Sequence, residues 1–276
     1  MSLDESAAVG TGISRSKAVA DYEAGLGRRR IMVRLSQFAF AILFLGFWQW
    51  ASGTLIDPFF ISSPSAVFTK LYAWTLNGQL YYHLSITLYA TALGFAIGAA
   101  IGFTMGLLFG EFAFVADVMD PFITALYSIP KLALAPLFII WFGIGIESKV
   151  AVSASIVFFV VFLNTFSGVR DVNPLFINAT RIMGASHLGV LRTVVIPSAT
   201  AWVITGLKVS VPYALVGTVI GEFMSSNRGI GFVIAQATGL FDTDSVFAGI
   251  IILAVVGAMI NGLLKKTETW LQRWKD

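Results

Sequence analysis

Six long apolar stretches constrain this chain more than any other feature of its sequence. The hydrocarbon core of a bilayer is about 30 Å thick, so a helix needs about 20 mostly apolar residues to cross it. Only 12% of the 276 residues are charged, whereas a soluble domain carries about 25%. The sequence therefore predicts an all-α membrane protein with about six transmembrane helices, at residues 35–52, 84–109, 118–141, 150–169, 199–220 and 246–264.

Composition and missing motifs exclude several functional classes. So few charges cannot cover the surface of a soluble enzyme or form a nucleic-acid-binding domain. The chain has no cysteine and only two distant histidines, His83 and His187, which argues against a disulfide framework or a clustered metal site. It also lacks a phosphate-binding loop, a nucleophile elbow and an H-E-x-x-H motif. We therefore expect a transport protein without catalytic residues, cofactor or metal of its own.

The polar and apolar segments predict four parts. Residues 1–34 form a polar N-terminal tail, and 35–64 form the first transmembrane helix and an outer loop. Residues 65–265 form the core domain, with a long loop at 170–197, and 266–276 form a C-terminal tail. Within the core, residues 65–82 are amphipathic and rich in aromatic side chains, which favours a helix at the membrane interface.

The distribution of basic residues predicts the orientation. With the N-terminus inside, the inner segments hold 13 lysines and arginines and the outer segments hold three. Inner loops of membrane proteins carry the excess of Lys and Arg. Both termini are therefore expected in the cytoplasm.

Small residues at regular spacing predict close helix packing. Every fourth residue of the second apolar stretch is glycine, which leaves one helix face flat enough for another backbone to approach. The last stretch has a weaker stripe of the same kind. The first set is Gly94, Gly98, Gly102, Gly106 and Gly110, and the second is Ala254, Ala258 and Gly262.

The 170–197 loop is unusually long, and long ordered loops are usually functional. Asn173-Pro174 is a helix-start signal, and Gly184 allows a sharp bend between two short helices. Pro197 is expected at the start of the next span, where its missing N–H costs nothing. The loop's amphipathic pattern fits either a helix lying in the membrane interface or one docking into a groove of a soluble protein.

This loop resembles the cytoplasmic loop of ABC importer permeases, written E-A-A, three residues, Gly, nine residues, I-x-L-P. Asn178-Ala179-Thr180 occupies the E-A-A positions, so the usual glutamate is missing. The remaining matches are Gly184, Val194, Ile196 and Pro197. Residues 128–149 and the segments Gly221-Glu222-Phe223 and Arg228-Gly229-Ile230-Gly231 are similar to permeases of the nitrate, sulfonate and taurine importer family.

The resemblance implies a type I ABC importer permease bundle in the bacterial inner membrane. It implies a homodimer, two ATP-binding cassette subunits that hold ATP-Mg, and an extracytoplasmic solute-binding protein. The solute would be a small one, such as nitrate, a sulfonate or a taurine-like anion, moved by alternating access. The residues implied in coupling to the ATPase are Asn178, Ala179, Thr180, Arg181, Gly184, Ala185, His187, Leu188 and Pro197. The alternative is a gradient-driven carrier or channel without an ATPase.

One lysine lies within an apolar stretch. A charge at bilayer depth normally faces a cavity or a partner, so Lys131 is predicted to line the translocation path. It could instead snorkel to an interface or pair with a carboxylate. The other candidate path residues are Tyr127, Ser128, Pro130 and Asn164. At the end of the fifth span, Glu222 and Arg228 are expected to form an ion pair at the rim.

Overall fold

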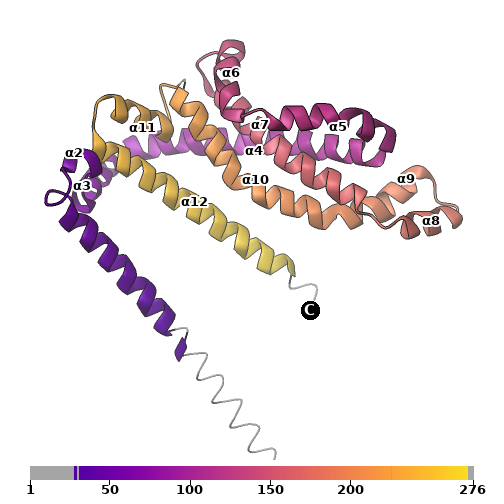
Figure 1. Cartoon of the computed structure of the whole chain (residues 1–276), viewed down its shortest axis with the longest axis horizontal. Coiled ribbons are helices and arrows are strands. Elements are labelled where there is room, and N and C mark those ends of the chain that lie inside the picture. Colours follow the sequence, from indigo (N-terminus) through magenta and orange to yellow (C-terminus); the bar gives the residue numbers. More distant parts are fainter. Residues whose placement is uncertain (1–27, 30, 225, 273–276) are drawn as a thin grey trace, which may run out of the picture. The chain divides into compact units, whose positions relative to one another are not determined.

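The computed structural model describes residues 28–272 except 30 and 225, without the side chains of residues 113 and 267–272. The described residues form helices and one isolated bridge between Ser52 and Ile56 (Figure 1). The chain divides into two compact units, Met1–Ser65 and Ala66–Asp276, here called unit 1 and unit 2. The polar tail predicted for residues 1–34 lies mostly outside the described residues.

Unit 1 contains the first expected span, an apolar helix at Ile31–Ala51. A one-turn helix, α2 (Pro58–Ile61), follows it, and the Asp57 carboxylate caps α2 by accepting the N–H of Phe59. The indole N–H of Trp48 donates to the carbonyl of Ile61 at 3.1 Å. This bond ties the short helix back to the end of the long one.

Unit 2 contains the remaining helices. They are α3 (Pro64–Leu76, which begins at the unit boundary), α4 (Gln79–Glu111), α5 (Ala113–Ser128), η1 (Lys131–Leu134), α6 (Ala135–Phe142), α7 (Ile146–Arg170), α8 (Pro174–Ile182), α9 (His187–Val190), η2 (Leu191–Val195), α10 (Ile196–Met224), α11 (Ile230–Gly239) and α12 (Thr243–Gln272). The single helix predicted at 65–82 is divided, because Gly78 adopts a φ of 76° between α3 and α4.

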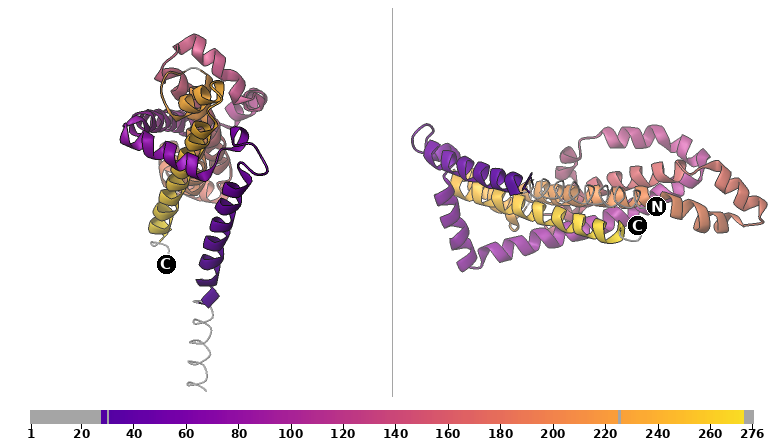
Figure 2. Two further views of the ribbon diagram at one scale, coloured as in Figure 1. Left: turned by 90° about the vertical axis from the view of Figure 1, so that its left-hand side faces the viewer. Right: turned by 90° about the horizontal axis from the view of Figure 1, so that it is seen from below.

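Helix α7 is the centre of unit 2, with α4 and α10 packed along it (Figure 2). The glycine face predicted on α4 is confirmed. A Cβ added at Gly98 would lie 2.5 Å from the carbonyl oxygen of Ala154, and one at Gly102 would lie 2.7 Å from that of Phe158. Only glycine allows these backbones to come so close.

The weaker stripe on α12 packs against no other helix of the described chain. A Cβ added at Gly262 would meet nothing within 4 Å, and Ala254 and Ala258 are exposed. The prediction that this stripe packs against another helix is therefore wrong for the described chain. Three small residues at this spacing are common enough in membrane helices to occur without a packing partner.

The third expected span is not one continuous helix. Among the described residues, five helices are long and apolar enough to cross a membrane, and a sixth crossing exists if a pair bent by 84°, Phe114–Ser128 and Lys131–Phe142, counts as one. The break follows from Pro130, which lacks an N–H and disfavours the helical conformation at the preceding residue. Ile129 accordingly has an extended backbone, with φ −68° and ψ 126°.

The fifth span starts earlier than predicted. Its helix runs without interruption from His187 to Met224, so Pro197 lies inside it and not at its start. The five residues before α10, Leu191–Val195, form a π-helical turn. Since a proline in a helix removes one hydrogen bond and crowds the carbonyl four residues back, the wider turn gives Pro197 room.

Candidate coupling surface and solute pocket

The loop at residues 170–197, here called the coupling loop, contains two short helices. The side chain of Asn173 accepts the N–H of Leu175 at 2.9 Å and caps α8, which starts with Pro174. Ser186 caps α9 by accepting the N–H of Gly189 at 3.2 Å. Between them Gly184 has a φ of 87°, so the predicted bend at this glycine is present.

A buried apolar cluster anchors the coupling loop to the ends of the long helices. Its members come from α7, the loop itself, η2 and α10: Val169, Val172, Val190, Val195 and Ala199. Ile177 of α8 and Ala185 pack against this cluster. A displacement of the loop must therefore displace the ends of α7 and α10 with it.

The opposite side of the loop exposes large apolar side chains. Ile182 and Met183 are each 86% exposed, and three neighbours are also open to the surroundings: Leu175, Phe176 and Leu188. These five side chains are here called the apolar patch. An exposed apolar group of this kind next to polar residues is typical of an interaction site.

The structure gives the nine residues assigned to coupling unequal positions. Seven are exposed: Asn178, Ala179, Arg181, Gly184, His187, Leu188 and Pro197. Thr180 and Ala185 are half-buried. The sequence assignment omitted four residues of the apolar patch, although their apolar type next to polar residues was the available signal: Leu175, Phe176, Ile182 and Met183.

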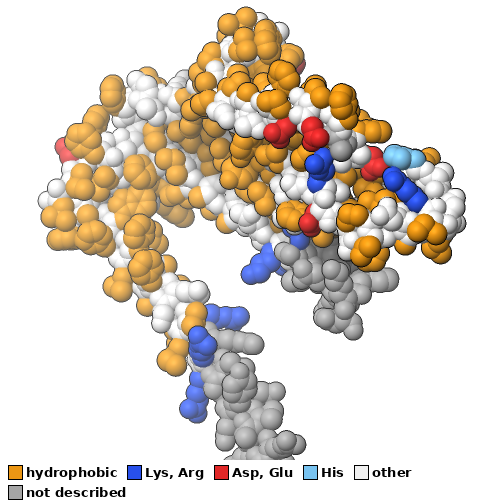
Figure 3. Space-filling model, turned by 45° about the vertical axis from the view of Figure 1, so that its right-hand side comes forward, with side chains coloured by type: hydrophobic (Ala, Val, Ile, Leu, Met, Phe, Trp, Pro, Cys, Tyr) orange, Lys and Arg blue, Asp and Glu red, His pale blue; other side chains and the backbone are white. Residues whose placement is uncertain are grey.

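A contact between His187 and Glu111, which is an ion pair when the imidazole is protonated, links the coupling loop to α4. The Nε2 atom of His187, the first residue of α9, lies 3.1 Å from Oε1 of Glu111, the last residue of α4. The ring of Phe112 stacks on the imidazole, with 6.2 Å between centroids. Arg170 and Asp117 lie 3.9 Å apart at the same end, where charged and histidine side chains gather (Figure 3). Neither Glu111 nor Asp117 was singled out in the sequence.

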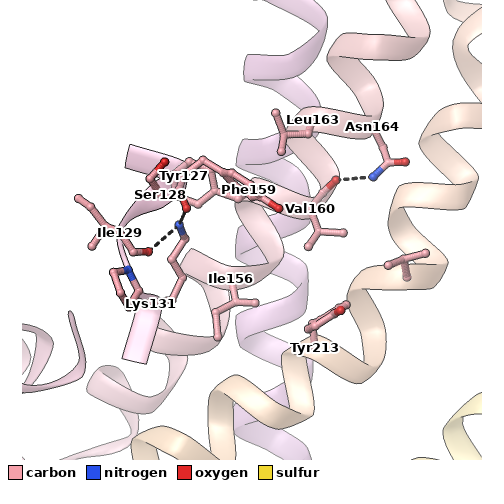
Figure 4. A pocket seen from close by; sticks show the side chains of 12 residues that line it. Tyr127, Ser128, Ile129, Lys131, Ile156, Phe159, Val160, Leu163, Asn164 and Tyr213 are labelled. Atoms are coloured by element: carbon pink, nitrogen blue, oxygen red, sulfur yellow. Dashed lines mark hydrogen bonds between the residues drawn. The ribbon is translucent and has the colours of Figure 1, made fainter. Parts of the chain in front are cut away.

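A pocket of about 570 Å³ lies between the bent pair and the faces of α7 and α10 (Figure 4). All five residues predicted for the translocation path line it: Tyr127, Ser128, Pro130, Lys131 and Asn164. The other seven, missed in the sequence because they look like ordinary core residues, are Ile129, Ile156, Phe159, Val160, Leu163, Val209 and Tyr213. The volume is typical of a small-molecule site.

Lys131 is held by backbone carbonyls and not by a carboxylate of the described residues. Its ammonium group donates to the carbonyls of Leu126 and Ile129 at 3.0 Å, and to that of Tyr127. It also lies 4.3 Å from the ring centroid of Phe159. No ion pair among the described residues includes Lys131. The lysine thus closes the open end of α5 and keeps its positive charge at the pocket wall.

The polar groups of the pocket are few. Ser128 donates to the carbonyl of Thr124 and Asn164 to that of Val160, both at 2.8 Å. The lining described above contains one lysine and no Asp or Glu. Among the described residues no group of three or more His, Cys, Asp or Glu side chains is placed to hold a metal ion.

Comparison with known proteins decides the family. The family model described as "binding-protein-dependent transport system inner membrane component" matches residues 94–272. The chain belongs to this family of permeases. It is 33% identical to a putative aliphatic sulfonates transport permease of Bacillus subtilis over 84% of each chain. It is 36% identical to the riboflavin transport system permease of Chloroflexus aurantiacus, over 85% of this chain and 88% of that one.

A solved structure shows the same fold. The inward-facing MetNI methionine ABC transporter superposes with a TM-score of 0.58 at 17% identity, covering 66% of this permease and 91% of that chain. The permease is thus an ABC importer subunit with several membrane-spanning helices and a type I fold, as the sequence predicted. Its relatives' names show that the family serves different solutes.

Proposed function

We propose that this permease imports a small anion by alternating access, driven by ATP-binding cassette subunits that dock on the apolar patch. The observation that carries this proposal is the shape of the coupling loop. One side exposes Ile182 and Met183, and the other side packs into the cluster at the ends of α7 and α10. A soluble partner that moves this loop therefore moves the spanning helices.

The coupling loop faces the cytoplasm in this proposal, and so do both termini. The support is the excess of lysine and arginine in the loops on that side, 13 against three. Cytoplasmic placement is also what an ATP-driven partner requires. Of the two possibilities for the amphipathic α8, docking to a soluble protein is favoured over lying in the membrane interface, since apolar residues are exposed on both of its ends.

The proposed assembly has two copies of the permease, two ATPase subunits and an extracytoplasmic solute-binding protein. ATP-Mg is held by the ATPase subunits, because this chain's sequence has no phosphate-binding loop. The permease contributes the pathway and the coupling loop, with the nine coupling residues at or beside the docking surface. Asn178 stands where the family motif has glutamate, so apolar contacts carry more of the docking here.

The pocket supports an anionic solute. It contains the positive charge of Lys131 without a facing carboxylate, and a fixed charge in a site of low dielectric constant attracts the opposite charge. Aliphatic sulfonate, the solute named for the Bacillus subtilis relative, has this charge and an apolar part that suits the aromatic lining. The riboflavin named for the other relative is the competing class, and comparison of the two solutes tests the assignment.

Reconstitution tests the function. The permease is expressed with a tag, its co-purifying ATPase subunits are reconstituted with it in liposomes, and uptake of radiolabelled alkanesulfonate is measured with its binding protein. We expect uptake only when ATP is present on the side of the liposome membrane where the ATPase subunits are bound. Uptake driven by an ion gradient without ATP hydrolysis would establish the gradient-driven carrier instead.

A glycine variant tests the coupling role. Gly184→Trp places a bulky side chain on the docking surface, so uptake should fall about tenfold or more while ATP hydrolysis continues, a loss within the range of ordinary coupling energies. Gly78→Trp is the matched control, because Gly78 also has a positive φ and open space around its Cβ but lies between α3 and α4. Equal uptake in both variants would contradict the coupling role.

A further inference from the structure

The start of α11 is held by side chains from two other helices. The N–H groups of Gly229, Ile230 and Gly231 donate in turn to Nδ1 of His83 at 3.1 Å, Oγ1 of Thr87 at 2.9 Å and Oε2 of Glu222 at 2.8 Å. The first N–H groups of a helix have no partner within the helix. Here α4 and α10 supply the acceptors.

Glu222 is the centre of this arrangement. It is only 1% exposed, and the hydroxyl of Thr87 donates to its Oε1 at 2.9 Å. The ion pair predicted with Arg228 is absent from the ion pairs of the described residues. The prediction placed Glu222 on a solvated rim, whereas the packing of α4 and α11 covers it and supplies hydrogen-bond donors to its carboxylate.

Helix α7 joins the same network. Lys149 is 3% exposed, and its ammonium group donates to the carbonyl of Arg228 at 2.8 Å. Helix α10 also approaches α7 closely at this point, since a Cβ added at Gly221 would lie 2.8 Å from the Cα of Lys149. The four side chains His83, Thr87, Lys149 and Glu222, with the backbone of residues 228–231, are here called the far-end network.

Two glycines in residues 228–231 allow the backbone to pass close to the carboxylate of Glu222. Gly229 has a φ of 110°, and a Cβ there would overlap the carboxylate of Glu222. A Cβ at Gly231 would lie 2.8 Å from the Cβ of Glu222. No side chain larger than hydrogen fits at either position without moving Glu222, so the segment and the carboxylate are matched to one another.

The far-end network lies at the opposite end of the long helices from the coupling loop. His83 and Thr87 are near the start of α4, whereas Glu111 at its end contacts the loop. Lys149 is near the start of α7, and Glu222 is near the end of α10. The three helices contacted by the loop at one end are therefore joined to one another at the other.

We infer that Glu222 is a positioning residue that binds the far ends of α4, α7 and α10 to α11, so that the four helices move as one body. This inference rests on the proposed function, because the motion it transmits is the one imposed on the coupling loop. Loss of the carboxylate leaves buried N–H and O–H donors without acceptors, and such groups are costly to leave unpaired. The helices then move separately, and ATP hydrolysis no longer produces the full displacement.

Spin-label distances test this directly, because the chain has no cysteine of its own. One pair of labels is placed on cysteines introduced at Tyr81 and Leu240, two exposed positions at the far end. The labelled permease is diluted with unlabelled permease, assembled with its ATPase subunits in liposomes, and measured without nucleotide and with ATP plus vanadate.

We expect the Tyr81–Leu240 distance to stay narrow and unchanged between the two states of the wild type. In Glu222→Ala it should broaden, and transport per ATP hydrolysed should fall about fivefold or more. Glu222→Gln should restore both, because its amide can accept from Gly231 and donate to Thr87. Glu147→Ala, which removes an exposed carboxylate at the same end of α7, is the matched control and should match the wild type.

Other results would overturn the inference. A wild-type Tyr81–Leu240 distance that shifts with nucleotide, or one that stays narrow in Glu222→Ala, means that the helices are not joined through Glu222. Where Glu222→Ala cannot be purified, Thr87→Val takes its place with the same expected broadening. Failure of the proposed function is distinguishable, since ATP then drives no uptake by the wild type, whatever the Tyr81–Leu240 distance does.

Discussion

The two ends of the α4–α7–α10 bundle are built in opposite ways. At the far end, the buried Glu222 and Lys149 bind backbone groups of the same chain. At the coupling end, Ile182 and Met183 are 86% exposed, and the side chain of His187, which contacts Glu111, is exposed as well. The far end thus satisfies its own polar groups, while the coupling end keeps an apolar surface uncovered.

This difference shows how the helices of one chain can hold together rigidly and still be moved by a partner protein. Between the ends, the backbones of α4 and α7 touch through the glycine face, and packed interiors transmit displacement with little compression. A partner that binds the exposed coupling end can therefore displace the far end as well. A chain with two internally satisfied ends would offer no place for that partner.

The largest effect is expected from disrupting the close packing of α4 on α7, which lies between the far end and the coupling end. Gly102→Leu would force a side chain against the backbone of Phe158, and overpacking of this kind costs about 3 kcal/mol or more. We expect little folded permease in fluorescence-detected size-exclusion chromatography. Gly262→Leu is the control, since a Cβ there meets nothing within 4 Å. A normal yield of Gly102→Leu would show that α4 and α7 do not depend on their close approach.

The second largest effect is expected from substitutions in the apolar patch at the coupling end. The double variant Ile182→Asp, Met183→Asp places two charges on the apolar patch and should weaken binding of the ATPase subunit by about 2 kcal/mol or more, the size of an interface hot spot. Co-purification with titrated ATPase measures it. Leu76→Asp, a 70% exposed leucine at the end of α3, should bind ATPase as the wild type does. Unchanged affinity of the double variant would place the docking surface elsewhere.

A smaller effect is expected from the ion pair that connects the loop to α4. Glu111→Gln should lower transport per ATP by about twofold to fivefold while the permease stays folded, because the packed cluster still holds the loop. Asp117→Asn is its control, since the Arg170–Asp117 pair is longer, at 3.9 Å, and exposed. An effect of Asp117→Asn as large as that of Glu111→Gln would show that the contact of His187 with Glu111 has no particular role in coupling the loop to α4.

The smallest effect is expected at a half-buried ion pair near the far end. Lys70 lies 2.9 Å from Asp242. Burial raises the pKa of Asp242, but hydrogen bonds from Ser245 and Lys70 and the charge of Lys70 outweigh this and hold the pKa below its ordinary value. A carboxyl whose pKa is lowered by folding stabilises the protein above its unfolded pKa, and this stabilisation is lost as the pH falls through the folded pKa.

Asp242→Asn should therefore lower the free energy of unfolding by no more than about 1 kcal/mol at neutral pH. The difference from the wild type should start to shrink as the pH falls below about 4 and should vanish once the pH is below the lowered pKa of Asp242. Thermal unfolding in detergent across this pH range measures it. A difference that grows toward acid pH would contradict the sign of the effect.

The sequence was informative wherever a short stretch of chain determines the result. Hydropathy located the spans, the four-residue glycine repeat located the α4–α7 contact, and Gly184 located the bend in the coupling loop. The break at Pro130 was missed as a break, although the proline was seen, because hydropathy measures polarity and not helix continuity.

The network around Glu222 was beyond the sequence for another reason. His83 and Gly229 are 146 residues apart and meet only in the fold, so no local pattern marks Glu222 as buried. The carbonyl partners of Lys131 depend likewise on how the chain turns after Ser128. The roles of the coupling and path residues remain predictions, since their positions alone do not establish what they bind.

Hydrogen–deuterium exchange of the permease, with and without its ATPase subunits, tests the central claim most directly. The claim is that the far end is completed within the chain and the coupling end by a partner. We predict slow exchange of the amides of Gly229, Ile230 and Gly231 in both samples, and new protection on ATPase binding confined to residues 174–188. Fast exchange at those three amides in the permease alone, or no added protection at 174–188, would contradict the account.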